Sequence, residues 1–128
     1  KDNSLKTIIE NMQHPHGGKQ TDNISLATST NSGEIVVVKN GEEYRYYTTL
    51  LDEKPVELGA MEWLQNSIMI DDYIITIDSN RTSFLIFDPT NQLFDMIPYN
   101  MDWAIQDIVC GTLNEKQKSL LQQISLPI

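Results

Sequence analysis

Residues 34–47 have the sequence EIVVVKNGEEYRYY, and this stretch decides the fold. A β-branched run precedes Asn40-Gly41, and an aromatic run follows it. Asn-Gly readily adopts the two positive φ angles of a type I′ turn, whose twist matches that of two antiparallel strands. The stretch therefore predicts a β-hairpin with strands over Glu34–Lys39 and Glu42–Leu50.

Further strands are expected on both sides of this hairpin. Residues 24–28 alternate between apolar and polar side chains, and three longer apolar runs follow at Ser67–Ile77, Ser83–Phe87 and Gln92–Ile97. Residues 78–81 and 88–91 separate these runs with turn-forming side chains. Because short connections favour antiparallel neighbours, we expect one antiparallel sheet of about five to six strands, a hairpin plus a meander, with no internal repeat.

Helices are expected mainly towards the two ends of the chain. Apolar residues recur at the i, i+3, i+4, i+7 spacing from Leu5 to Met12, which predicts an N-terminal helix that stops at Pro15. Residues 14–23, which include His14-Pro15-His16, are expected to form a surface loop. Residues 56–64 are expected to form a short helix or helical turn.

Two helices are predicted after Pro98. Asp102 is placed to cap the first and Gly111 to end it, and Thr112-Leu113-Asn114-Glu115 matches the capping box of the second. The expected fold is therefore α+β: a single globular domain, residues 1–128, whose antiparallel sheet has N- and C-terminal helices packed against it.

Charge limits the choice of partner. The 128 residues include 9 Lys and Arg against 18 Asp and Glu, a net charge of −9. Nucleic acid is excluded as a ligand, because phosphate binding is driven by Lys and Arg, whereas a basic protein is the natural complement. No apolar run approaches the length of a membrane span, so no membrane association is expected.

The cysteine content indicates a reducing compartment. Cys110 is the only cysteine, which rules out an intrachain disulfide, and its apolar neighbours predict a buried, inert thiol. This usage suits the cytoplasm.

The sequence contains no motif that identifies a reaction. It lacks the Gly-x-Ser-x-Gly elbow and both phosphate-binding glycine motifs, and His14-x-His16 with Asp22 supplies too few ligands for a closed zinc site. The aspartates stand in turns or at a predicted helix cap, where a structural role suffices. We therefore expect no enzymatic activity, no metal and no cofactor. A hydrolase would instead need a carboxylate whose pKa is raised in a cleft.

Tyrosines and carboxylates are gathered in the hairpin and in one later turn. Glu42-Glu43 adjoins Tyr44, Tyr46 and Tyr47, and Asp71-Asp72 precedes a predicted strand. Tyrosine rings supply contact area in protein interfaces and carboxylates supply steering, so this set favours recognition of a Lys- and Arg-rich protein. The alternatives are a regulatory interaction domain without catalysis, and a small-ligand or carbohydrate-binding module that uses Trp63, Tyr99 and Trp103.

Residues 71–111 contain, in order, an acidic turn, the strands Tyr73-Ile74-Ile75-Thr76-Ile77-Asp78 and Ser83-Phe84-Leu85-Ile86-Phe87-Asp88, a third strand and a predicted helix with Trp103-Ala104-Ile105. This order resembles the C-terminal half of the SUKH superfamily of bacterial toxin-immunity proteins. The resemblance implies a cytoplasmic immunity protein that neutralises a cognate basic toxin, commonly a nuclease, by covering its cationic active site. The contact residues expected under this interpretation are Glu42, Glu43, Tyr46, Asp71 and Asp72.

Overall fold

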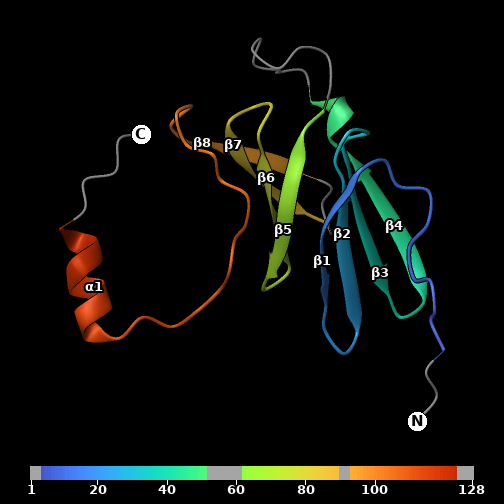
Figure 1. Ribbon diagram of the computed structural model, residues 1–128, viewed down its shortest axis with the longest axis horizontal. Coiled ribbons are helices and arrows are strands. Elements are labelled where there is room, and N and C mark those ends of the chain that lie inside the picture. Colours follow the sequence, from blue (N-terminus) through green and yellow to red (C-terminus); the bar gives the residue numbers. More distant parts are fainter. Residues whose placement is uncertain (1–3, 52–61, 90–92, 124–128) are drawn as a thin grey trace.

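The computed structural model describes residues 4–51, 62–89 and 93–123, and the regular secondary structure within them consists mainly of β-strands (Figure 1). The strands are β1 (Pro15–Gln20), β2 (Ile24–Ser29), β3 (Glu34–Lys39), β4 (Glu42–Tyr47), β5 (Leu64–Ile70), β6 (Tyr73–Asp78), β7 (Ser83–Asp88) and β8 (Leu93–Pro98). A 3-10 turn, η1 (Thr48–Leu50), follows β4, and one helix, α1 (Glu115–Gln122), lies near the C-terminus.

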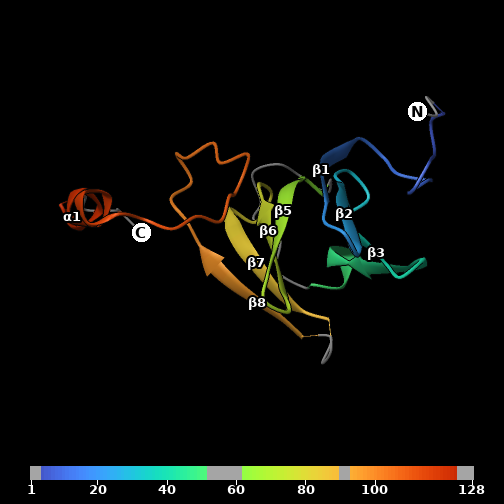
Figure 2. The same cartoon turned by 90° about the horizontal axis from the view of Figure 1, so that it is seen from below.

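The strands form two separate four-stranded antiparallel sheets. The first sheet has the order β1-β2-β3-β4 and the second has the order β5-β6-β7-β8, so each strand pairs with its neighbour in sequence. Figures 1 and 2 show the two sheets as distinct layers. The core between them is formed by Leu26, Ile35 and Val37 from the first sheet and by Leu64, Ile74, Leu85 and Phe87 from the second.

The expectation of a single sheet with helices packed on it is therefore wrong. Two unpredicted strand boundaries explain the difference. Asp71-Asp72 turns the chain between Ile70 and Tyr73, which splits the expected strand Ser67–Ile77 into β5 and β6. Residues 15–20, expected in a loop, form β1 and pair with β2 through an irregular register. With apolar residues on both faces of their strands, the two meanders bury one face of each against the other.

The predicted hairpin is confirmed. Asn40 and Gly41 have φ angles of 53° and 79°, and β3 pairs with β4 from Lys39↔Glu42 to Glu34↔Tyr47. The second strand is shorter than expected, because η1 begins at Thr48.

The predicted N-terminal helix is absent from the described residues 4–13, which form an irregular segment beside the first sheet. The Arg45 guanidinium donates hydrogen bonds to the carbonyls of Glu10 and Asn11, and Asn11 has a φ of 58°. These backbone groups are thereby held outside a helical ladder, so apolar periodicity alone does not produce a helix here.

The C-terminal prediction is partly wrong. Residues 102–111 contain no helix: the Asp102 backbone amide donates to the Asn100 side chain, and Cys110 is exposed and not buried. The second predicted helix exists as α1, but its capping box joins Asn114 and Gln117. None of the residues of α1 is buried, so it does not pack against a sheet.

Residues 52–61, which hold most of the predicted 56–64 helix, lie outside the described residues, whereas Leu64 begins β5. Among the described residues no helix is long and apolar enough to cross a membrane.

Candidate functional site

A groove opens between the two sheets at the end where the β3–β4 hairpin meets the β5–β6 turn. Its volume is about 420 Å³. Lining residues come from four strands and two turns: Ile24, Val37, Lys39, Tyr44, Tyr46, Met69, Asp71, Asp72 and Pro89. The groove therefore combines apolar and aromatic side chains with a pair of carboxylates.

Tyr46 joins the groove to the core. Its ring lies 4.3 Å from the ring of Phe87, centroid to centroid, at an angle of 52°. Tyr46 and Met69 are half-buried and pack against the core cluster. Burial raises the pKa of the Tyr46 hydroxyl, so the neutral phenol is the form presented to the groove over the ordinary pH range.

Acidic groups border this aromatic surface. The Tyr44 hydroxyl donates a 2.5 Å hydrogen bond to the Glu42 carboxylate, which raises the pKa of Tyr44. Asp71, with a φ of 53°, and Asp72 form the turn between β5 and β6, and both are exposed. Lys39 is a cation in the same groove, so its lining is not uniformly acidic.

Three of the five predicted contact residues line this groove: Tyr46, Asp71 and Asp72. Glu42 is connected to it through the hydroxyl of Tyr44. Glu43 lies away from the groove, because side chains alternate between the faces of β4 and Glu43 shares the opposite face with Arg45. There the Arg45 guanidinium lies 3.0 Å from the carboxylate of Glu43 and 3.2 Å from that of Glu34.

The groove also contains residues outside the five expected contacts. Tyr44 belongs to the predicted set of tyrosines and carboxylates, and it has a local signal, because it lies two residues before Tyr46 and so shares its face of β4. Met69 and Pro89 have none, since they reach the groove only through the packing of the second sheet on the first.

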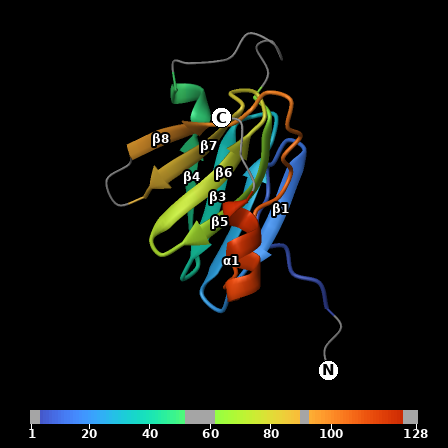
Figure 3. The ribbon, with the colours of Figure 1, turned by 90° about the vertical axis from the view of Figure 1, so that its left-hand side faces the viewer.

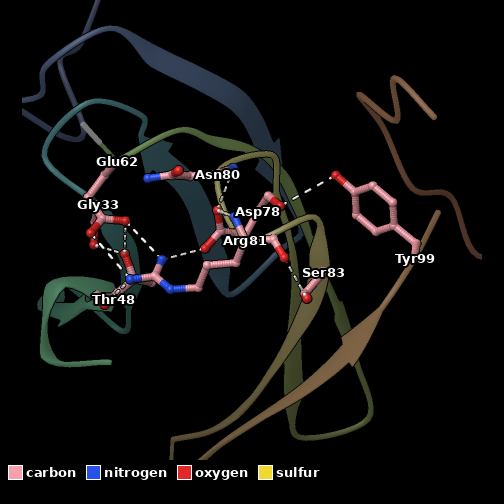
Figure 4. Close-up of polar contacts among 8 residues, drawn as sticks. All are labelled: Gly33, Thr48, Glu62, Asp78, Asn80, Arg81, Ser83 and Tyr99. Carbon is pink, nitrogen blue, oxygen red and sulfur yellow. Dashed lines mark hydrogen bonds and ion pairs between the residues drawn. The ribbon is translucent and has the colours of Figure 1, made fainter. Parts of the chain in front are cut away.

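A second polar cluster lies buried where the end of the first sheet meets the β6–β7 turn (Figure 4). The Arg81 side chain is only 1% exposed. Its guanidinium donates to Glu62 at 2.9 Å, to Asp78 at 2.5 Å and to the Thr48 carbonyl at 2.9 Å. Asp78 also accepts the backbone amides of Asn80 and Arg81, at 2.9 and 3.0 Å.

The burial and bonding of this cluster indicate a structural role. Burial raises the pKa of Asp78, although hydrogen bonds from Arg81 oppose the shift. Burial alone would lower the pKa of Arg81, but its bonds to Glu62 and Asp78 outweigh that effect and the net shift is upward. The charged groups are covered by protein and already bonded to one another, which favours a role in joining the two sheets over contact with a substrate.

The residues weighed as metal ligands or ligand-binding aromatics are dispersed. In the described part of the chain no three His, Cys, Asp or Glu side chains gather to hold a metal ion, and a ring nitrogen of His14 lies 2.7 Å from the side-chain amide of Asn31. Tyr99 is buried, with its hydroxyl 3.4 Å from the Asp78 carbonyl, whereas Trp63 is partly exposed. These aromatic residues do not line the groove with Tyr44 and Tyr46.

Comparison with known proteins gives no match. No protein-family model matches the chain, and neither a curated protein nor a solved structure resembles it at a significant level.

Proposed function

We propose that this protein is a non-catalytic binding module that holds a basic segment of another protein in the groove between its sheets. One observation carries the proposal: Tyr44 and Tyr46 line the same groove as the Asp71-Asp72 turn. Tyrosine rings contribute contact area with little conformational entropy to lose, and carboxylates attract and orient Lys and Arg.

The specific form of the proposal follows the SUKH resemblance. The partner is then a basic toxin, commonly a nuclease, that is neutralised in the cytoplasm of the producing cell. A nuclease presents cations to its substrate, so an acidic protein bound there excludes nucleic acid and pairs with the cations. The net charge of −9 supports a partner of opposite, positive charge.

The sharpest test compares two tyrosines on opposite faces of β4. Tyr44 and Tyr47 are 42% and 45% exposed, but only Tyr44 lines the groove. We expect Tyr44→Ala to weaken binding of the captured basic partner about tenfold, as loss of an interface tyrosine commonly does, while Tyr47→Ala has little effect. The measurement is the dissociation constant for the partner purified on the wild-type protein from its own source.

A second pair of variants tests the charges. Asp71→Asn with Asp72→Asn should slow association and reduce its salt dependence, whereas Asp102→Asn, exposed and outside the groove lining, should not. Equal losses for Tyr44→Ala and Tyr47→Ala would place binding elsewhere. A partner that binds the groove but whose nuclease activity is unaffected would support a binding module and refute neutralisation of a nuclease.

A further inference from the structure

The first sheet ends in an open strand. β4 is the last strand in the order β1-β2-β3-β4, and among the described residues no further strand pairs with its outer side. The Thr48 amide, directly after β4, donates to the Gly33 carbonyl at 2.8 Å and so points towards the β3 side. Because backbone groups alternate in direction along an antiparallel strand, every second residue of β4 points its amide and carbonyl away from β3. These residues are Glu43, Arg45 and Tyr47.

The outer edge of the second sheet is closed. β8 is the last strand of that sheet and lies at its margin (Figure 3). The Tyr99 amide donates to the Thr82 carbonyl at 2.9 Å, so the even-numbered residues of β8 are the ones that face outwards. Of these, Pro98 has no amide hydrogen, and the Met96 amide donates at 2.9 Å to the side chain of its neighbour Asp95. Natural sheets prevent a further strand from pairing by such means.

The two remaining edges are covered by other parts of the chain. β1 lies against β5, because a Cβ added to Gly17 would come within 2.9 Å of the Asn66 Cα. β5 donates amide hydrogen bonds away from β6, from Leu64 to the Thr30 carbonyl and from Asn66 to the Gln106 carbonyl, both at 3.4 Å. In the described part of the chain, β4 is therefore the sheet edge whose backbone groups are left to pair.

This edge adjoins the proposed binding groove. Tyr44 and Tyr46 line the groove with the Asp71-Asp72 turn. A strand added to β4 would point every second side chain into the groove, towards these carboxylates. Its other side chains would lie on the opposite face, where the Glu43 carboxylate is already paired with Arg45 at 3.0 Å. The complementary strand therefore carries Lys or Arg at every second position.

We propose that the partner binds as an extended basic strand added to the free edge of β4, with Lys or Arg at alternate positions facing the groove. This binding mode rests on the proposed function and specifies the class of ligand for the same groove. Backbone hydrogen bonds to β4 supply affinity, and the alternating basic side chains supply specificity. A second copy of this chain carries the same net charge of −9, which favours a basic strand over pairing of β4 with itself.

A synthetic peptide in which Lys and Thr alternate tests this mode, with its dissociation constant measured by fluorescence anisotropy. Two versions are N-methylated, one at every Lys amide and the other at every Thr amide. Each version has one edge blocked and the other intact, because alternate amides of an extended peptide point to opposite sides. We expect one version to bind about tenfold more weakly than the unmethylated peptide, and the other to bind equally well. Loss in the Thr version indicates an antiparallel strand, and loss in the Lys version a parallel one.

Glu43→Pro makes the corresponding change in the protein. It removes an amide that faces outwards, which an edge strand tolerates. Glu43→Ala is the matched control, since it removes the same charge and keeps the amide. We expect Glu43→Pro to bind the unmethylated peptide about tenfold more weakly than Glu43→Ala does, with the same circular dichroism spectrum. Should the spectrum change, the two methylated peptides decide.

Three results would overturn this binding mode. One is equal binding of the two methylated peptides; if Tyr44→Ala still weakens that binding, the groove remains the site and the proposed function stands. Another is no binding of the unmethylated peptide, which would exclude the alternating basic pattern, while the captured basic partner still tests the proposed function. The third is a free protein that sediments as a dimer and that Glu43→Pro dissociates, which would assign the edge to a second copy.

Discussion

Arg81 makes the polar contacts that connect the two sheets. It lies in the second sheet's β6–β7 turn, yet it donates to the Thr48 carbonyl beyond the end of the first sheet and to two buried carboxylates. Replacing Arg81 with Met would remove the guanidinium that pairs with the buried carboxylates of Asp78 and Glu62. We expect a loss of about 3–5 kcal/mol in the free energy of unfolding, measured by urea denaturation.

The same substitution makes stability depend on pH in a defined direction. Burial raises the pKa of Asp78 in the folded state, so protonation favours folding. The stability from this group is complete below the ordinary carboxyl pKa, about 4, and is lost as pH rises through the raised value. The loss in Arg81→Met should therefore be smaller at pH 5 than at pH 8. A loss independent of pH would show that the carboxylates are not the cause.

Gly41, at the tip of the β3–β4 hairpin, allows the backbone requirement of this turn to be tested. Gly41 has a φ of 79°, and an added Cβ would meet no atom within 4 Å. Gly41→Ala should therefore cost about 1 kcal/mol from backbone conformation alone. Gly18→Ala is the control, since Gly18 also has open space around it but no positive φ. Equal unfolding midpoints for the two variants would contradict this explanation.

Elements defined by local chemistry were predictable from the sequence. The β3–β4 hairpin follows from Asn40-Gly41, and α1 was expected within a few residues of its position because a capping sequence precedes it. The segment 4–13 was not predictable, because its backbone is bound by Arg45 from a distant strand. Asp71-Asp72 is named as an acidic turn in the sequence, yet the apolar run Ser67–Ile77 predicts a strand that continues through it, because aspartate is not restricted to turns as Asn-Gly nearly is.

For the candidate site, the residue types could be predicted from the sequence, but their arrangement in the whole molecule could not. Tyr46, Asp71 and Asp72 could be selected because tyrosines and acids are typical of interfaces, but their meeting in one groove depends on how the two sheets pack.

The net charge of −9 predicts how the binding proposed above responds to salt. Binding of a basic protein should weaken between 50 and 500 mM NaCl, because screening removes the attraction of opposite charges. Titrations at three salt concentrations measure the dissociation constant, and binding that salt leaves unchanged or strengthens would contradict an electrostatic contact with a basic partner.

The order of the strands in the sheets has a consequence for how the chain folds. Every strand pairs with a sequence neighbour, and even the widest strand pairings only join Ile24 to Lys39 and Ser83 to Pro98. Loop closure over such short separations costs little entropy, so each meander can form quickly and before it meets the other. The slow step is then docking of the two meanders, which buries Arg81. Arg81→Met should accordingly speed unfolding more than it slows the formation of either meander.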